Sequence, residues 1–255
     1  MLEPILESTR SRVAALRLRA DEVEAAAVVS AVPRDFIGAL RAPGLGVIAE
    51  VKRRSPSAGS IAPDLDPARL ASAYESGGAA AISVLTEPDH FGGSLQDMSE
   101  VGEATSLPVL RKDFILDPLQ IDEARTGGAD AVLLIAAILS DQVLAGLIEH
   151  VGHFGMTALV EAHDSEELRR AVDLGARVVG VNNRDLATFV VDLETSIRLR
   201  RHIPSTVVAV AESGINSPED ARRMHDAGFD AVLVGSAAAG AEDPAAFVAG
   251  LEQLA

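Results

Sequence analysis

The segments "TGGADAVLLI" at residues 126–135 and "DAGFDAVLVG" at residues 226–235 share one pattern, in which the end of a helix meets glycine and then a short apolar run. Glycine readily adopts the left-handed backbone conformation that closes a helix, and the apolar run after it is typical of a buried strand. The segments "SGGAAAISVL" at 76–85 and "DLGARVVGV" at 173–181 follow the same order. The repeat predicts helices that lead directly into buried strands.

The chain contains eight such strand candidates, separated by amphipathic segments that are typical of helices. This alternation predicts parallel βαβ units. The two most similar copies of the pattern lie four strands apart, which favours a closed (β/α)8 barrel over an open doubly wound sheet. No glycine-rich nucleotide loop follows the first strand, where the sequence reads "KRRSPSAGS" at 52–60. The strand candidates are 47–51, 81–85, 108–112, 131–136, 157–161, 178–182, 206–212 and 231–235.

We therefore predict an α/β protein with the (β/α)8 TIM barrel fold and an N-terminal helical extension. Residues 1–255 are expected to form a single barrel domain, with residues 1–45 as the helical extension packed on it. The turn-rich segment "RAPGLG" at 41–46 would join the two parts.

Composition restricts the function classes. A net charge of −16 argues against binding to nucleic acid or to an anionic membrane, and no apolar run is long enough for a transmembrane helix. The chain has no cysteine, which suits a reducing compartment, so we expect a cytoplasmic protein. Its six histidines form no zinc-binding motif, so we expect no metal site.

Polar residues at the carboxyl ends of the predicted strands indicate the position of the active site, because barrel enzymes place it there. Side chains alternate along a strand, so Glu50 and Lys52 share the inward face with Ile48. Charges that end otherwise apolar strands suggest function rather than packing. The rim predicted in this way contains Glu50, Lys52, Lys112, Glu161, Asn182 and Glu212.

Lysine is rare in this chain. Lys52 and Lys112 are its two lysines, so 22 − 2 = 20 of its basic residues are arginine. An ammonium group can release a proton in a suitable environment, whereas a guanidinium in a protein effectively cannot. The two lysines are therefore interpreted as proton donors or switchable charges, and a composition bias that spared them by chance is the alternative.

Glycine and serine follow the last two predicted strands, in "ESGINSPED" at 212–220 and "VGSAAAGAED" at 234–243. Loops at these positions of a barrel often bind phosphate through backbone N–H groups. Neutral donors of this kind, with Lys52 nearby, would allow an acidic protein to bind an anion. Ordinary turn glycines are the alternative interpretation.

Several segments together resemble the indole-3-glycerol phosphate synthase family, from about residue 5 to the C-terminus. They are "VIAEVKRRSPSAGSI", "ISVLTEPDHFGGSLQD", "LPVLRKDFILDPLQIDEAR", "GADAVLLIAAIL", "VGVNNRDLATF", "AESGI" and "VLVGSA". The resemblance implies ring closure, decarboxylation and dehydration of an anionic phosphosugar-anthranilate, 1-(2-carboxyphenylamino)-1-deoxyribulose 5-phosphate, to indole-3-glycerol phosphate. It also implies no cofactor and a monomer.

The resemblance further implies residue roles. Lys112 corresponds to the general acid of ring closure, Lys52 to a second catalytic lysine, Glu161 to a general acid or base, and Glu50 to a carboxylate that orients Lys52. Which glutamate serves which half-reaction is left open. The expected substrate-binding residues are Asn182, Arg184, Glu212, Ser213, Phe91 and Phe114, and the expected phosphate-binding residues are Ser55, Gly214, Gly235 and Ser236.

Some positions depart from the family pattern. Ala58 replaces a residue that is commonly basic, and an alanine-rich stretch follows Ser236. No aromatic residue precedes Phe36, so any contact from the extension to an aromatic substrate must be aliphatic. Three arginines, Arg53, Arg54 and Arg111, are expected to be surface charges.

Other functions remain open on the residues alone. They are another phosphosugar barrel enzyme such as a phosphoribosylanthranilate isomerase, a Schiff-base aldolase using one of the lysines, and a non-catalytic phospholigand-binding barrel.

Overall fold

The computed structural model describes residues 2–55, 59–185 and 188–252. Eight parallel strands form a closed barrel, in which β1 pairs with β10 on one side and with β4 on the other. The predicted (β/α)8 TIM barrel is thus confirmed. The barrel strands are β1 (Gly46–Val51), β4 (Ala81–Leu85), β5 (Val109–Lys112), β6 (Ala131–Ile135), β7 (Thr157–Ala162), β8 (Val178–Asn182), β9 (Val208–Glu212) and β10 (Ala231–Val234).

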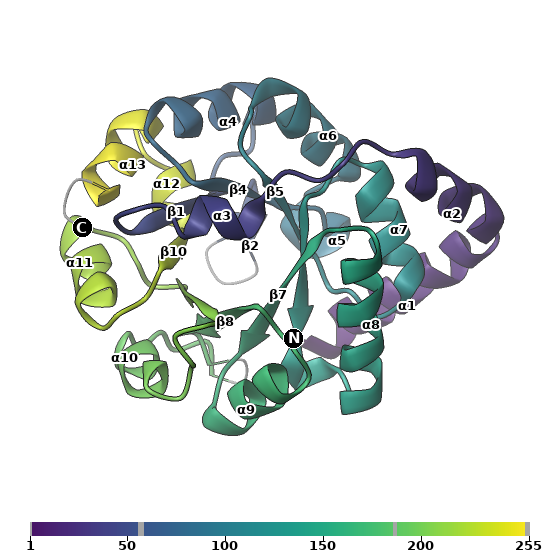
Figure 1. Ribbon diagram of the computed structural model, residues 1–255. Coiled ribbons are helices and arrows are strands. Elements are labelled where there is room, and N and C mark those ends of the chain that lie inside the picture. The colour runs from purple at the N-terminus through teal and green to yellow at the C-terminus, as the bar shows by residue number, and fades with distance from the viewer. Residues whose placement is uncertain (1, 56–58, 186–187, 253–255) are drawn as a thin grey trace.

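Helices surround the barrel, as Figure 1 shows. The predicted N-terminal extension contains α1 (Leu2–Arg17), α2 (Ala20–Val29) and α3 (Phe36–Leu40). The remaining helices are α4 (Pro67–Ser76), α5 (Pro88–Phe91), α6 (Leu95–Ala104), α7 (Pro118–Thr126), the 3-10 turn η1 (Ala136–Ile138), α8 (Asp141–His153), α9 (Ser165–Asp173), α10 (Glu194–Arg200), α11 (Pro218–Asp226), α12 (Ser236–Ala239) and α13 (Pro244–Glu252). A short antiparallel pair, β2 (Arg54–Ser55) and β3 (Gly59–Ser60), follows β1.

Local sequence explains where the helices begin and end. Helix α7 begins with a capping box in which Asp117 and Gln120 satisfy each other's backbone N–H groups, and Pro118 occupies the first turn. The helix is followed by Gly128, whose φ of 85° lies in the left-handed region, and Gly228 after α11 has a φ of 90°. The glycine repeat therefore turns each helix into the next strand, as the sequence predicts.

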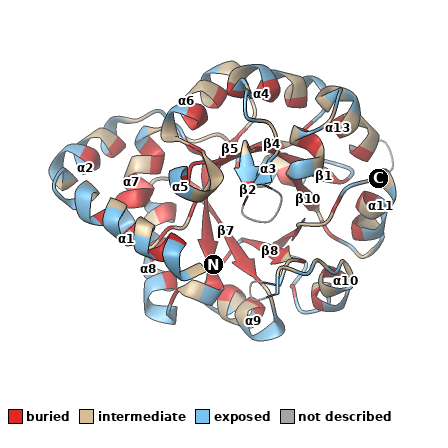
Figure 2. Cartoon of the chain, turned by 180° about the vertical axis from the view of Figure 1, so that it is seen from behind, coloured by how far each residue is buried: buried red, intermediate tan, exposed pale blue. Residues whose placement is uncertain are grey.

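Two apolar cores lie on the two sides of the strands. The larger core fills the space between the strands and the surrounding helices, and Figure 2 shows buried residues along the ring of strands and exposed residues on the outer faces of the helices. The smaller core fills the barrel interior. Helix α3 lies across one end of the barrel in Figure 1, and it contributes the buried Phe36 and Leu40 to the interior core. This end is closed by apolar packing.

The alternation of side chains places the charged residues at the opposite end of the barrel. Leu110 and Leu159 belong to the interior core, so Lys112 and Glu161, two residues further along, face the same interior. The strand register aligns Ile135 with Glu161 and Asn182 with Glu212. On β5, β7 and β9 the interior column thus ends in a charged residue, whereas on β6 it ends in the apolar Ile135.

The prediction that Arg111 is a surface charge is wrong. Arg111 points outward from β5 but is only 1% exposed, because helices cover the outer face of the barrel. Its guanidinium lies 3.1 Å from the Asp113 carboxylate and 2.9 Å from the Glu123 carboxylate, and it donates to the Gln120 carbonyl oxygen. The protein can bury this charge because the guanidinium N–H donors are paired with carboxylate and carbonyl oxygens.

Arg53 is partly buried rather than free on the surface, since its guanidinium bonds the Asp97 carboxylate at 2.8 Å and the Leu65 carbonyl oxygen. Arg54 is exposed, as expected. The departure expected at Ala58 lies outside the described residues, and the alanine-rich stretch after Ser236 lies in α12.

The N-terminal extension is joined to the barrel by an ion pair close to the end of β5. The Arg12 guanidinium of α1 bonds both oxygens of Asp113, at 3.2 and 3.1 Å. Asp113 is buried and also accepts a hydrogen bond from Thr86. Helices α1 and α2 pack along α7. None of the helices in the described residues is long and apolar enough to cross a membrane.

Candidate active site

A cavity of about 510 Å³ opens at the carboxyl end of the strands, which is a volume suited to a small organic ligand. All fourteen residues that the sequence analysis singled out for the site lie in its wall. They are Glu50, Lys52, Ser55, Phe91, Lys112, Phe114, Glu161, Asn182, Arg184, Glu212, Ser213, Gly214, Gly235 and Ser236. The location of the site is therefore as expected, whereas the role of each residue is a separate question.

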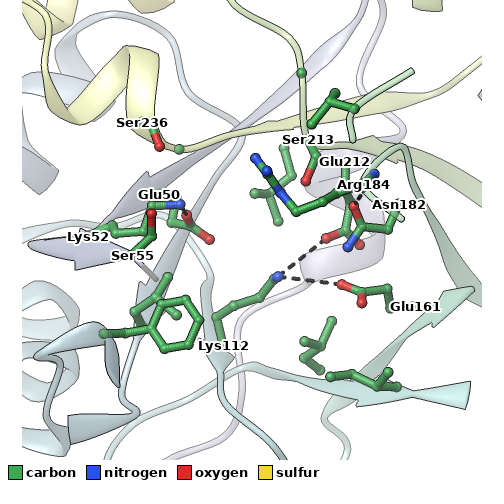
Figure 3. A pocket seen from close by; sticks show the side chains of 18 of the residues that line it. Glu50, Lys52, Ser55, Lys112, Glu161, Asn182, Arg184, Glu212, Ser213 and Ser236 are labelled. Atoms are coloured by element: carbon green, nitrogen blue, oxygen red, sulfur yellow. Dashed lines mark hydrogen bonds and ion pairs between the residues drawn. The ribbon is translucent and has the colours of Figure 1, made fainter. Parts of the chain in front are cut away.

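Lys112 lies between two glutamates inside the barrel mouth. Its Nζ is 3.4 Å from Glu212 and 3.6 Å from Glu161, and Figure 3 shows the ammonium directed at both carboxylates. Burial alone would lower the pKa of Lys112, but the carboxylates of Glu212, Glu161 and Glu50 outweigh burial and raise it. The ammonium is thus kept protonated by acidic neighbours, rather than made easier to deprotonate by other cations.

The two glutamates beside Lys112 have different pKa values. Burial raises the pKa of Glu212, and repulsion from Glu161 and Glu50 raises it further. Together they outweigh the attraction of Lys112, and the pKa is about 8. Burial would also raise the pKa of Glu161, but Lys112 and His163 outweigh it and lower this pKa. At neutral pH Glu212 therefore holds a proton while Glu161 is ionised. Two carboxyl groups with separated pKa values can act as an acid and a base.

Lys52 forms a closer pair with a single glutamate. Its Nζ lies 2.6 Å from Glu50 Oε1, and the two side chains are 15% and 4% exposed. Gly235 makes room for this pair, because a Cβ at this position would lie 2.4 Å from Glu50 Oε1 and 2.8 Å from Lys52 Nζ. Any side chain at residue 235 would therefore displace the ion pair. The contact with Glu50 therefore holds the Lys52 ammonium at one position in the cavity wall.

The cavity has an apolar side suited to an aromatic ring. The rings of Phe91 and Phe114 lie with their centroids 6.3 Å apart and are tilted by 42°. Phe91 is held in place by Glu87, whose buried carboxylate caps the first turn of α5 and accepts the Phe91 backbone N–H. Leu2 and Ile5 of α1 also line the cavity, so the contact from the extension is aliphatic, as the sequence predicts.

Small residues form another part of the cavity wall. In Figure 3, Ser55, Lys52 and Ser236 lie on one side of the cavity, away from Glu161 and Asn182. Ser213 and Gly214 follow β9 with positive φ values of 64° and 84°. A φ of this kind is uncommon for serine, and such residues often occur at functional sites. The wall here offers hydroxyl and backbone groups to a ligand.

The loop after β8 carries both an expected and an unexpected cavity residue. Arg184 lines the cavity, donates from its guanidinium to the Phe189 carbonyl oxygen at 3.2 Å, and donates its backbone N–H to Asn182 Oδ1 at 3.0 Å. Phe189 also lines the cavity and has a positive φ of 61°. Sequence reasoning missed Phe189, since a phenylalanine in a loop gives no local signal of where the loop folds.

His163 was also missed. It follows β7, two residues after Glu161, and its Nε2 lies 3.4 Å from Glu161 Oε1. The signal available in the sequence is its position just after a strand end that carries a candidate acid. Among the described residues, no group of three or more His, Cys, Asp or Glu side chains has the arrangement of a metal site.

Comparison with known structures shows the barrel fold alone. Thiamine phosphate pyrophosphorylase from Pyrococcus furiosus superposes with a TM-score of 0.63 at 20% sequence identity, covering 82% of this chain and 95% of that one. The 3-hexulose-6-phosphate synthase of Salmonella typhimurium gives a TM-score of 0.65 at 16% identity, covering 82% and 98% of the two chains.

Comparison with known sequences is much more specific. The family model for indole-3-glycerol phosphate synthase matches residues 2–251. The indole-3-glycerol phosphate synthase of Parafrankia sp. (strain EAN1pec) is 53% identical, covering 98% of this chain and 94% of the relative. That of Mycobacterium avium (strain 104) is 51% identical, covering 98% and 93%. This chain belongs to the indole-3-glycerol phosphate synthase family.

Proposed function

We propose that this chain closes the indole ring of 1-(2-carboxyphenylamino)-1-deoxyribulose 5-phosphate, giving indole-3-glycerol phosphate, CO2 and water. Membership of a carboxy-lyase family of tryptophan biosynthesis supports this proposal. The observation that carries it is the position of Lys112, whose ammonium meets two glutamates of different pKa inside the barrel mouth. The reaction needs one strong hydrogen-bond donor and carboxyl groups that exchange protons, and in this group Lys112 and Glu161 can meet these needs.

In the first step, the ring carbon that carries the carboxylate attacks the ribulose carbonyl carbon. Negative charge develops on the carbonyl oxygen, and a preorganised cation in a buried site stabilises it. Lys112 is the general acid in this proposal, because its Nζ is buried at the mouth and points into the cavity. The raised pKa of Lys112 ensures that the donor is protonated before the substrate binds.

In the second stage, CO2 leaves and the new hydroxyl is eliminated as water. Elimination requires a proton for the departing oxygen and a base for a carbon-bound proton. Glu161 and Glu50 are the ionisable groups that we assign to this stage, and Lys52, held 2.6 Å from Glu50, stabilises the departing hydroxyl and the substrate carboxylate.

Substrate binding is divided among three groups of residues in the cavity wall. We assign the anthranilate ring to the wall formed by Phe91 and Phe114, and the substrate polar groups to the side chains of Asn182, Arg184 and Ser213. The phosphate is assigned to the small residues Ser55, Gly214, Gly235 and Ser236 of the same cavity wall. Backbone and hydroxyl donors suit an anion in a protein of net charge −16. A cytoplasmic monomer is part of the same proposal.

A Schiff-base mechanism is less consistent with the site. An amine attacks a carbonyl only in its neutral form, and the acidic neighbours of Lys112 raise its pKa. The same lysine is well suited to donate a hydrogen bond or a proton.

The direct test is to mix the purified protein with the proposed substrate and to follow indole absorbance and fluorescence. The chain has no tryptophan and one tyrosine, so its own emission is weak at these wavelengths. We expect product formation with release of CO2 in a 1:1 ratio. Binding of the substrate without indole formation would contradict the proposal and would favour a phospholigand-binding barrel.

A further inference from the structure

His163 lies behind the cavity wall, where it joins one rim carboxylate to a second carboxylate nearer the surface. It sits in the loop between β7 and α9, and its side chain is 13% exposed. Its Nε2 is 3.4 Å from Glu161 Oε1, and its Nδ1 is 3.1 Å from Glu167 Oε2. The imidazole thus bridges a glutamate that faces the substrate cavity and a glutamate of α9.

Glu167 fixes the orientation of the ring. The same Oε2 atom that faces Nδ1 also accepts the His163 backbone N–H at 2.8 Å. Asp164 caps α9 by accepting the Glu166 and Glu167 backbone N–H groups, which holds the start of this helix beside the ring. A carboxylate at Nδ1 requires a hydrogen on that nitrogen, so the other ring nitrogen faces Glu161.

The contact between Nε2 and Glu161 requires a proton. Nε2 is buried and has no hydrogen-bond partner of normal geometry among the described residues. If both Nε2 and the Glu161 carboxylate lacked a proton, two lone pairs would face each other at 3.4 Å at a buried ring nitrogen. One proton therefore belongs to this pair, either on the ring or on Glu161.

The charges around the ring favour its protonated form. Burial would lower the pKa of His163, but Glu167, Glu161 and Glu212 outweigh burial and raise it. Lys112 is the cation on the far side of the two rim glutamates. The ring is thus surrounded by more negative than positive charge, and it can hold a proton near neutral pH.

The proposed reaction has a net demand for one proton. The substrate carboxylate leaves as neutral CO2, and its electron pair restores the aromatic ring. The carbonyl oxygen takes one proton at ring closure and a second one when it leaves as water, while one carbon-bound proton is released to form the new double bond. Two protons consumed and one released leave one proton to be supplied by solvent in each turnover.

The groups at the rim have little contact with solvent themselves. The side chains of Glu161 and Glu212 are 4% and 2% exposed, and a bound substrate would cover the cavity side of both. His163 is not among the described residues that line the cavity, so it stays in place behind Glu161 when the cavity is filled.

We propose that His163 is a positioning residue that supplies the net proton of each turnover to Glu161 from outside the substrate cavity. The imidazolium Nε2–H passes its proton to the Glu161 carboxylate, which becomes the acid that the dehydration step uses. The neutral ring keeps its Nδ1–H on Glu167, and its Nε2 regains a proton through Glu161 from the solvent that enters the cavity when the product leaves. The inference rests on the proposed function, because the proton demand is that of the ring-closing reaction.

The test compares His163→Gln and His163→Ala with the wild type, using steady-state indole fluorescence between pH 6 and 9. We expect kcat to fall by about tenfold or more with KM changed by less than about twofold, because the loss concerns proton supply and not binding. The wild-type kcat should decrease as pH rises through the raised pKa of His163, and this decrease should be absent in His163→Gln. Added imidazole should restore part of the activity of His163→Ala.

His150 offers a matched control. It also pairs with a carboxylate, with Nε2 3.1 Å from Asp122 Oδ1, but it lies on α8 outside the cavity. His150→Gln should leave kcat and its pH profile unchanged. A His163→Gln variant with wild-type kcat and pH profile, or a His163→Ala variant that imidazole does not restore, would overturn the inference.

The outcomes separate this inference from the proposed function. If the wild type forms no indole, the function itself is wrong, whereas a normal wild type with an unaffected His163→Gln variant contradicts only the role of His163. If His163→Ala loses its fold, as judged by circular dichroism, the pH profile of His163→Gln decides alone.

Discussion

The two lysines of this chain stand in different surroundings at the same barrel mouth. Lys52 has one carboxylate partner, Glu50, at 2.6 Å. Lys112 has two carboxylate partners, Glu212 and Glu161, at the longer distances of 3.4 and 3.6 Å. The Lys52–Glu50 pair is close and contains one basic and one acidic group. The Lys112 group has longer distances and contains two acidic groups for one basic group.

This difference suggests a division of labour. A balanced, close pair holds a positive charge at a fixed place, which suits substrate binding and the stabilisation of a departing group. A lysine with two carboxyl groups, one of which holds a proton at neutral pH, suits proton transfer.

The largest effect is expected for Lys112→Arg. The variant keeps the positive charge, but a guanidinium does not release its proton and its planar shape fits the two glutamates differently. We expect kcat to fall by roughly 10²–10⁴-fold, with substrate binding retained within a few-fold by calorimetry. Lys52→Arg is the matched control, and its loss of kcat should be clearly smaller. Equal losses in the two variants would contradict the division of labour.

A smaller but distinct effect is expected for Lys52→Met. The substitution removes one positive charge from the cavity and leaves Glu50 buried without its partner. KM should rise by about tenfold, and rapid-quench mass spectrometry should show a cyclised intermediate that has not lost water.

The double variant Glu50→Gln with Lys52→Met also removes the Glu50 carboxylate that Lys52→Met leaves without its partner, and it serves as the control. Normal affinity and no intermediate in Lys52→Met would exclude Lys52 from the site.

The smallest effect is a pH-dependent change in stability for Glu212→Gln. The pKa of Glu212 is raised to about 8 in the folded protein, so the folded state binds this proton more tightly than the unfolded state. The resulting stabilisation is complete below the ordinary glutamate pKa and is lost as pH rises toward about 8.

Glutamine does not ionise, so the Glu212→Gln variant does not lose this stabilisation as pH rises. Relative to the wild type, its free energy of unfolding should therefore be higher at pH 8.5 than at pH 5 by at least about 1 kcal/mol, or roughly 2–4 °C in Tm. Thermal melts of wild type and variant at the two pH values measure the difference. A Tm difference that does not change with pH would show that Glu212 has an ordinary pKa. In that case neither glutamate beside Lys112 would hold a proton at neutral pH.

Much of the site could be predicted from the sequence because strand ends and side-chain alternation are local properties. Each of Glu50, Lys112, Glu161 and Glu212 ends an apolar run with the parity of the interior. The parity of a strand residue therefore gives the direction of its side chain before any tertiary contact is known.

The residues that were missed depend on partners far away in the sequence. Arg111 points away from the interior, as its parity requires, but it is buried because α7 covers it and supplies Glu123. The carboxylate that it shares, Asp113, is also bonded by Arg12, 101 residues earlier in the chain. No periodicity within a strand or helix contains this information. The same applies to Phe189, which reaches the cavity through the fold of its loop.

The first helix has a practical consequence for handling the protein. Its Leu2 and Ile5 line the cavity, and its Arg12 bonds the residue next to Lys112. The last described helix, α13, instead packs on the outside of the barrel against α4 and β1. Purification tags, fluorescent labels and surface-immobilisation linkers should therefore be attached behind α13, since the same addition ahead of Leu2 would be placed beside the substrate entrance.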